Sequence, residues 1–273
     1  MEITFFGIPK VSPDDVVKGT IAIIGANIVT KSVHKEYGVG RAARVLREVS
    51  QEYTGHIPAL DIDIHEKDVV DVGDFGREDL GRVVNKILEN GGVVLVIGGD
   101  HATTYYSLRD TNLEHIVWLD AHLDIYPENK VSHASALRYL LVGDNKKRAT
   151  IIGFRGYSTP KIELEQVKEL GIDIISYPFL EEELIRRLES AEAISLDIDF
   201  FDAFVFKATR VPEILGINPK DFILVLRKLK NVRARYFDLV EYCPEIDVGY
   251  VHGKLLVQMI LEVIAVFLRS GYG

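Results

Sequence analysis

The sequence predicts a three-layer α/β/α fold in which helices cover both faces of a central, mostly parallel sheet. Short apolar segments rich in valine and isoleucine alternate along the chain with longer segments of helical periodicity. Strands that are apolar throughout are typical of a parallel sheet that is buried on both faces. No glycine- or serine-rich linker divides the 273 residues. We therefore expect a single domain over residues 1–273.

The strands are predicted from short apolar runs that are bounded by turn residues. In chain order they are residues 20–25, 69–73, 93–97, 116–119, 150–153, 172–176, 193–196 and 235–240. The helices are predicted from apolar residues on one face, such as Val45, Leu46 and Val49, and from end signals such as Gly91-Gly92. In chain order they are residues 40–53, 79–90, 103–109, 132–141, 162–170, 181–190, 219–230 and a last helix beginning at Val251.

The segment 251–270 is apolar and long enough to resemble a membrane span. It carries Lys254, Gln258 and Glu262 at four-residue steps, and Arg269 lies two turns beyond Glu262. These residues form one polar stripe on an otherwise apolar helix. Because charges in the middle of a bilayer are costly, we predict a mostly buried helix and no membrane partner.

Composition excludes several classes of function. The net charge of −9 argues against a nucleic-acid partner, because phosphate binding needs a basic surface. The single cysteine, Cys243, excludes an internal disulfide and a cysteine-rich zinc site. Residues 1–10 lack the basic segment and the long apolar run of a signal peptide. We therefore expect a cytoplasmic protein.

Several predicted strands lead directly into side chains that can bind metal ions. In chain order these side chains are His101, then Asp120, His122 and Asp124, and then Asp197 and Asp199. Within the second and third groups the residues alternate, and alternate side chains of an extended chain share one face. Each group is therefore expected to point at one spot.

The carboxyl ends of parallel strands meet at one edge of a sheet, where ligands commonly bind. Carboxylates that gather there repel one another, and bound cations would relieve the repulsion. Each motif alone is equally consistent with a carboxylate that caps a helix or a turn, but three such motifs together favour a metal site. Six oxygen and imidazole ligands suit two ions about 3.5–4 Å apart, with manganese favoured and zinc or iron as alternatives.

These motifs resemble the three signatures of the ureohydrolase family, which comprises arginase, agmatinase and their relatives. The matching segments are 98–101 (Gly-Gly-Asp-His), 120–124 (Asp-Ala-His-Leu-Asp) and 195–202 (Ser-Leu-Asp-Ile-Asp-Phe-Phe-Asp), with weaker matches at 38–50, 70–74 and 238–241. The resemblance implies the arginase-like version of the predicted fold. It also implies a small cationic guanidine as the binding partner, and a homo-oligomer, a trimer or hexamer.

The resemblance also implies a two-manganese centre and a role for each ligand. His101 and Asp124 would hold one ion, His122 and Asp199 would hold the other, and Asp120 and Asp197 would bridge them. Water activated between the ions would attack the guanidinium carbon, which would yield urea and an amine. By the same resemblance, His133 would transfer protons and Glu241 would hold the guanidinium group of the substrate.

Agmatine, hydrolysed to putrescine and urea as in polyamine biosynthesis, is the expected substrate because Ser132-His133 and residues 241–247 resemble the agmatinase version of the family. The chain departs from the family pattern at Ala134-Ser135, at Ala203 and in residues 206–212, where a glycine-rich loop is usual. Two alternatives are open for Lys207 and Arg210 in that segment. If they face the pocket, their charges would disfavour a cationic substrate; otherwise they face solvent.

Three alternatives stay open at this point. The first is another ureohydrolase activity, on arginine, guanidinobutyrate or formiminoglutamate. The second is a zinc deacetylase, which would leave the second metal pair without a purpose. The third is a non-catalytic, metal-binding regulatory relative.

Overall fold

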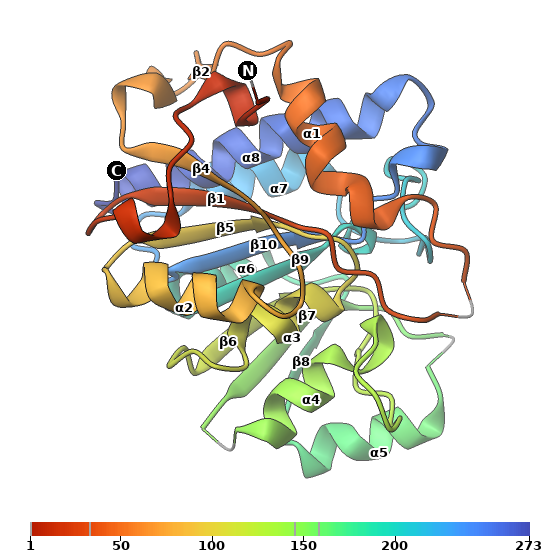
Figure 1. Ribbon diagram of the computed structural model, residues 1–273. Helices are drawn as coiled ribbons and strands as arrows, with labels where there is room; N and C mark the ends of the chain where they lie inside the picture. The colour runs from red at the N-terminus through yellow and green to blue at the C-terminus, as the bar shows by residue number, and fades with distance from the viewer. Residues whose placement is uncertain (1, 33, 145, 158) are drawn as a thin grey trace.

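Over the residues that the computed structural model describes (2–32, 34–144, 146–157 and 159–273), eight strands form a central sheet (Figure 1). In spatial order they are β4 (Val69–Phe75), β1 (Ile21–Ala26), β5 (Val93–Ile97), β10 (Tyr236–Val240), β9 (Ala193–Asp197), β6 (His115–Leu119), β7 (Arg148–Phe154) and β8 (Asp173–Ser176). All neighbouring strands of this sheet are parallel. The prediction of a mostly parallel sheet is confirmed.

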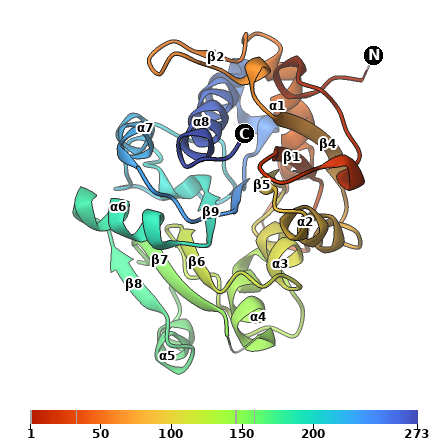
Figure 2. The same ribbon diagram turned by 90° about the vertical axis from the view of Figure 1, so that its left-hand side faces the viewer.

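Helices cover both faces of the sheet, as predicted (Figure 2). One face is covered by α1 (Ala42–Ser50), α6 (Glu181–Ser190), α7 (Pro219–Lys228) and α8 (Val251–Arg269). The other face is covered by α2 (Leu80–Glu89), α3 (Ala102–Leu108), α4 (Ala136–Gly143) and α5 (Lys161–Glu169). Strand β1 shows why its sequence is apolar throughout, since Ile21 and Ile23 pack into one core while Ala22 and Ile24 pack into the other.

The predicted bounds agree best where the apolar pattern is uninterrupted. Strand 93–97 and helix 181–190 have the predicted ends. Helix 40–53 is shorter than predicted, because residues 39–41 form a 3-10 turn and the helix ends at Ser50. The hairpin β2–β3 (His56–Ile57 and Ile62–Asp63) was not predicted, because strands of two residues show no periodicity.

Helix α8 is long and apolar enough to cross a membrane, but most of it is buried inside the protein. It packs against α1 and α7. Glu262, part of the predicted polar stripe, is itself buried and accepts hydrogen bonds from Arg227 Nε at 3.0 Å. The segment therefore forms a core helix, and α7 provides the partner for its buried charge.

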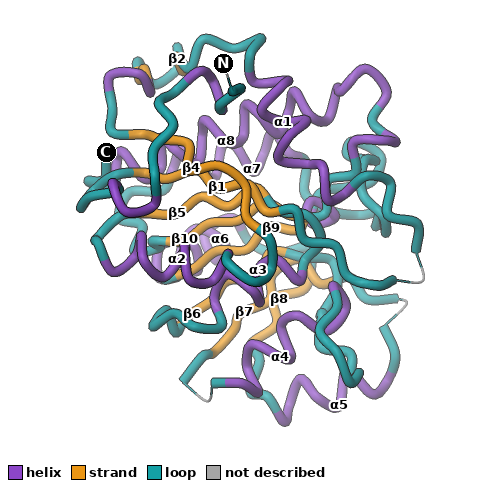
Figure 3. Tube along the Cα trace, in the orientation of Figure 1, coloured by secondary structure: helices purple, strands orange, loops and turns teal. Residues whose placement is uncertain are grey.

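The connections that follow β1 and β7 lie at the same side of the sheet (Figure 3). This side is formed by the carboxyl ends of the parallel strands, where the predicted ligands follow β5, β6 and β9. At this end of the sheet, loops rather than regular elements determine which side chains meet.

A buried ion pair joins α1 to the edge strand β4. Arg47 donates from Nε to Asp71 Oδ2 at 2.8 Å and from Nη2 to Asp71 Oδ1 at 3.0 Å, and it also pairs with Asp74. The backbone N–H of Phe5 donates to the same Asp71 carboxylate at 3.0 Å. One guanidinium therefore fixes the N-terminal segment, the first helix and the sheet edge together.

Replacing Arg47 with alanine should lower the free energy of unfolding by roughly 3–5 kcal/mol, because it leaves the buried Asp71 carboxylate without a countercharge. Arg44→Ala, on the exposed face of the same helix, removes only a surface pair with Glu48 and should cost less than about 1 kcal/mol. Denaturant unfolding of the two variants measures the difference. Equal losses of stability would contradict the role given to the buried pair.

Candidate metal centre

The four strands that precede the predicted site residues are neighbours in the sheet, in the order β5, β10, β9 and β6. They lead respectively to His101, Glu241, Asp197 and Asp120. Because adjacent strands lie about 4.8 Å apart, residues just beyond the ends of four strands converge within about 15 Å. The convergence is direct at one point, where the backbone N–H of His101 donates to Glu241 Oε1 at 2.9 Å.

The first cluster of donor atoms surrounds Nδ1 of His101. Three carboxylate oxygens approach this nitrogen, at 3.1 Å from Asp120, 2.9 Å from Asp124 and 3.2 Å from Asp197. Nδ1 nevertheless has no partner in hydrogen-bond geometry among the described residues. Ligand atoms bound to one ion at about 2.1 Å lie roughly 3.0–3.4 Å from one another. The observed spacing fits donor atoms that share a cation.

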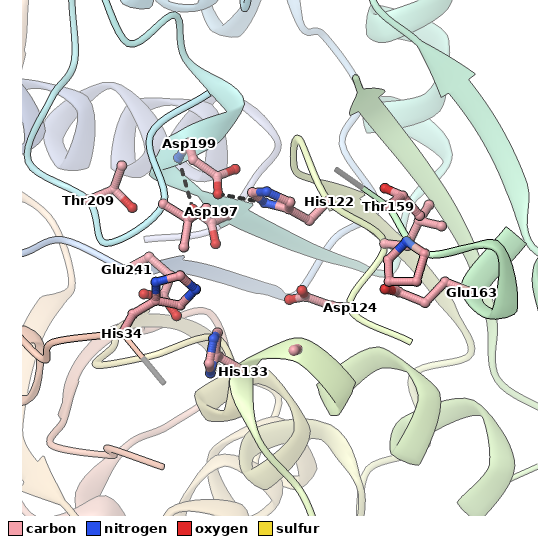
Figure 4. Close-up of a pocket in the computed structure, with 14 residues that line it drawn as sticks. His34, His122, Asp124, His133, Thr159, Glu163, Asp197, Asp199, Thr209 and Glu241 are labelled. Carbon is pink, nitrogen blue, oxygen red and sulfur yellow. Dashed lines mark hydrogen bonds and ion pairs between the residues drawn. The ribbon is translucent and has the colours of Figure 1, made fainter. Parts of the chain in front are cut away.

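The second cluster shares Asp120 with the first. His122 Nδ1 lies 2.9 Å from Asp199 Oδ2 and 3.5 Å from Asp120 Oδ1 (Figure 4 shows His122 and Asp199). The donor atoms of Asp120, His122 and Asp199 all lie within 4.8 Å of one another, as do those of His101, Asp120 and Asp197. One oxygen of Asp120 therefore faces each histidine. This arrangement places a carboxylate between two candidate metal sites.

The side chains converge through turns, and the predicted alternation along an extended chain is wrong. Strand β6 ends at Leu119, Asp120 Oδ1 accepts the backbone N–H of His122 at 2.6 Å, and Asp124 has a left-handed φ of 52°. Asp197 ends β9 and caps the 3-10 helix Ile198–Phe200, accepting from the backbone N–H of Asp199 at 2.8 Å. Asp197 thus both caps the 3-10 helix, through Oδ1, and belongs to the first cluster, through Oδ2.

A buried hydrogen-bond network orients His101. Its Nε2 lies 2.9 Å from Ser195 Oγ, which donates to Asp238 Oδ1 at 2.7 Å. Thr104 Oγ1 and Tyr236 Oη both donate to Asp238 Oδ2, at 2.7 and 2.6 Å. Since the Ser195 hydrogen points to Asp238, its oxygen accepts from His101 Nε2–H. When the imidazole is neutral, Nδ1 then presents its lone pair to the cluster, the orientation that a metal ligand requires.

Sequence reasoning missed this network. Ser195 and Asp238 lie within segments that resemble the family, but nothing in their spacing indicated a contact. Trp118 was also missed as a supporting residue, although its ring stacks on His101 at 3.9 Å and its Nε1 donates to Asp120 Oδ2 at 2.9 Å. These contacts join residues from β6, β9 and β10, so they exist only once the sheet has formed.

Crowded carboxylates give the cluster unusual protonation. Burial, with repulsion from Asp120, raises the pKa of Asp124 to about 7 and that of Asp199 to about 6. Burial acts to raise the pKa of Asp120 as well, but the adjacent imidazoles of His101 and His122 outweigh burial and lower it. Acids that resist ionisation in this way gain stability when cations neutralise them. Oxygen and imidazole donors without a thiolate suit hard or borderline divalent ions.

The clusters open into a cavity of about 190 Å³. Its polar lining includes His34, His122, Asp124, His133, Glu163, Asp197, Asp199, Thr209 and Glu241 (Figure 4). His133 Nε2 lies 3.4 Å from Ser32 Oγ, and burial lowers the pKa of His133 to about 4. The imidazole is therefore neutral near pH 7, with no charge to repel a cation.

Glu163 on α5 also lines the cavity, and the sequence did not indicate it. It stands among exposed charged residues of a surface helix, a pattern typical of a solvated face. In the structure its side chain is buried, and burial raises its pKa to about 7. Only the packing of α5 against the loop that contains Ile125 makes this acid part of the site.

Lys207 and Arg210, which were expected to face either the pocket or solvent, differ in their surroundings. Lys207 is exposed. Arg210 is buried and donates from Nε to Glu241 Oε2 at 2.8 Å and from Nη2 to Glu241 Oε1 at 2.6 Å. The carboxylate that the resemblance assigned to substrate thus already holds a guanidinium group from the chain itself.

Comparisons with known proteins agree with this architecture. Residues 19–265 match the arginase family. The chain is 25% identical over 233 residues to the mitochondrial guanidino acid hydrolase of Homo sapiens and 27% identical over 225 residues to the mitochondrial agmatinase of Gallus gallus. These matches cover 77% and 72% of this chain and 66% of each relative, just under two thirds of its length.

Solved structures share the fold over almost the whole chain. The agmatine ureohydrolase of Thermoplasma volcanium has a TM-score of 0.81 at 23% identity, and the match covers 92% of this chain and 91% of the ureohydrolase chain. The proclavaminate amidino hydrolase of Streptomyces clavuligerus has a TM-score of 0.84 at 20% identity, and the match covers 99% of this chain and 98% of the amidino hydrolase chain.

Metal binding should depend unequally on the two clusters. Asp120→Ala should weaken binding of both divalent ions, because Asp120 belongs to both sets, whereas Asp199→Ala should remove one ion and leave the His101 cluster able to bind the other. Asp110→Ala, which alters an exposed acid, should retain both. Calorimetric titration with Mn²⁺ gives the stoichiometries, and full binding by Asp120→Ala would contradict the shared position.

Glu163 predicts a pH-dependent stability of the ion-free protein. A carboxyl whose pKa rises from 4.5 to about 7 on folding loses stability as the pH rises through this window, because the folded state must then bury its charge. In EDTA, Glu163→Gln should therefore raise the melting temperature more at pH 8 than at pH 5. Glu165→Gln, on the exposed face of α5, should show no such difference. Equal shifts at both pH values would contradict the assignment.

Proposed function

Because this chain belongs to the arginase family, we propose that it is a metal-dependent hydrolase that cleaves a C–N bond of a guanidino group to release urea. The observation that carries the proposal is the position of Asp120 between His101 and His122. A buried carboxylate that directs one oxygen to each cluster suits a pair of ions. The cavity beside the clusters has room for a small group.

We propose two Mn²⁺ ions as the cofactors. His101, Asp120, Asp124 and Asp197 would hold one ion, and Asp120, His122 and Asp199 would hold the other. The family resemblance also implies that Asp197 bridges the two. When bound, such a pair acidifies a water molecule and stabilises the charge that develops on the attacked group. The chain contributes the orientation of His101 through Ser195 and Asp238, which fixes the ligand before the ion binds.

His133 is proposed to move the proton that the departing amine needs. It lines the cavity with the metal-binding acids and lies near Ser32 and His34. A buried neutral imidazole can accept a proton on one nitrogen while it carries one on the other. In the proposed role, His133 would take up the proton that the activated water releases and then pass a proton to the departing amine nitrogen.

Agmatine is the substrate proposed from the sequence, with arginine, guanidinobutyrate and formiminoglutamate as alternatives. A second candidate function is a non-catalytic, metal-binding relative, and the Arg210–Glu241 pair is the observation that favours it. A homo-oligomer and a cytoplasmic location stay predictions.

The test is product release from three guanidines and one formimino compound by the Mn²⁺-loaded protein. Agmatine, arginine, guanidinobutyrate and formiminoglutamate are offered separately, and formamide is measured for the last. Urea from agmatine, with less from arginine, supports the proposed substrate. Product from a different member of the panel supports the proposed hydrolase activity but makes that compound the substrate in place of agmatine. Absence of product from every compound, with both ions bound, favours the non-catalytic relative.

His133→Ala should slow urea release by about 10²- to 10⁴-fold, the usual contribution of a positioned acid or base. The Mn²⁺ content should stay unchanged, because His133 belongs to neither cluster. His56→Ala, which alters a histidine in the β2–β3 hairpin, is the matched control and should have full activity. Loss of metal together with activity in His133→Ala would show that the residue supports the metal centre instead.

A further inference from the structure

The guanidinium of Arg210 is held on Glu241 by a buried, two-point contact. Its Nε and Nη2 atoms reach the two oxygens of the carboxylate at 2.8 and 2.6 Å. The side chains of Arg210 and Glu241 are only 1% and 6% exposed. Two-point contacts of this kind are the strongest arrangement of a guanidinium with a carboxylate. The structure thus records directly that Glu241 binds a guanidino group.

Glu241 has little capacity left for a second guanidino group. Its Oε1 atom also accepts the backbone N–H of His101 at 2.9 Å. The two-point contact with Arg210 is buried, so the guanidinium charge balances the carboxylate charge. A cationic group that enters the cavity therefore meets a carboxylate whose charge is already balanced.

Further contacts, with Asp100 and within its own segment, hold Arg210 in place. Its Nη2 lies 3.9 Å from the buried Asp100 carboxylate, and its own segment is joined to the strand end by a hydrogen bond from the backbone N–H of Cys243 to the carbonyl of Ala208 at 2.8 Å. Phe206 and Ala208 of the same segment are fully buried. The arginine is thus part of the packed structure at the edge of the cavity.

From these contacts we propose that Arg210 is a specificity-determining residue that competes with the guanidino group of a substrate for Glu241. Both groups have the same shape and the same hydrogen-bond donors, and one carboxylate cannot hold two of them by two-point contacts. The intact protein therefore selects against compounds whose cationic guanidinium depends on Glu241. This inference rests on the proposed guanidino substrate and deepens it, because it names the residue that limits the substrate's affinity.

Replacing Arg210 should free Glu241 and strengthen guanidine binding. Arg210→Gln keeps a polar side chain, but it is uncharged and shorter than arginine by the Cζ and Nη atoms, so it cannot form the charged two-point contact. With Mn²⁺ bound, Arg210→Gln should bind agmatine at least about tenfold more tightly than the unaltered protein, the effect of one charge-assisted hydrogen bond. Lys207→Ala removes the same charge from an exposed position of the same segment and should leave the affinity unchanged. Isothermal titration measures both.

A double-mutant cycle with Glu241→Gln separates competition from a general loss of positive charge. In the unaltered background Glu241→Gln should not strengthen agmatine binding, because it leaves the buried charge of Arg210 without its partner. In the Arg210→Gln background the same change should cancel the tenfold gain. A gain that survives Glu241→Gln, or weaker binding by a folded, metal-loaded Arg210→Gln, overturns the inference and leaves Arg210 as a residue that positions Glu241.

The binding measurements also distinguish failure of this inference from failure of the proposed function. If no variant releases urea, the hydrolase proposal fails, while the affinities still decide the role of Arg210. If urea is released, KM for agmatine should fall in Arg210→Gln with little change in kcat, whereas loss of a positioning residue would lower kcat. Should Arg210→Gln fail to fold, Arg210→Lys preserves the buried charge without the two-point contact and should show a smaller gain; no gain overturns the inference.

Discussion

Repulsion among buried carboxylates is the constraint on which this end of the molecule depends. Asp120, Asp124, Asp197 and Asp199 are all nearly or fully buried at the ends of neighbouring strands, where uncompensated charge is very costly. The protein partly compensates with the imidazoles of His101 and His122. Divalent ions would compensate more completely, and the spacing of the donor atoms around His101 Nδ1 suits them. Bound ions at this candidate metal centre would thus serve both the proposed chemistry and the packing of these acids.

Elsewhere in the chain, arginine guanidinium groups neutralise buried carboxylates. Arg47 neutralises Asp71 beneath α1, Arg227 neutralises Glu262 on α8, and Arg210 neutralises Glu241 beside the cavity. The first two pairs join secondary-structure elements. The third involves a carboxylate that lines the cavity, where neutralisation has a consequence for ligands. One type of contact therefore serves stability in two places and, by our proposal, specificity in the third.

The network behind His101 shows how the fold supports the site. Ser195 lies on β9, Asp238 and Tyr236 lie on β10, and Thr104 lies on α3. Their hydrogen bonds determine which nitrogen of His101 faces the carboxylates. Because each of these residues is buried, the orientation of the imidazole is set by the packed sheet. A ligand held in this way loses little freedom when an ion binds.

The sequence alone determined the parallel sheet, the two helical layers and the meeting of the predicted ligands at one edge, because apolar runs and the polar residues that end them are local patterns. It could not determine how the ligands converge: turns at Asp120 and Asp197 replace the expected strand alternation. It also could not assign Glu163, Ser195 or Asp238 to the site, or decide where Arg210 points. These features depend on contacts between segments far apart in the chain, such as the contact of Arg210 with Glu241, 31 positions later. Such contacts leave no periodic signal in the sequence.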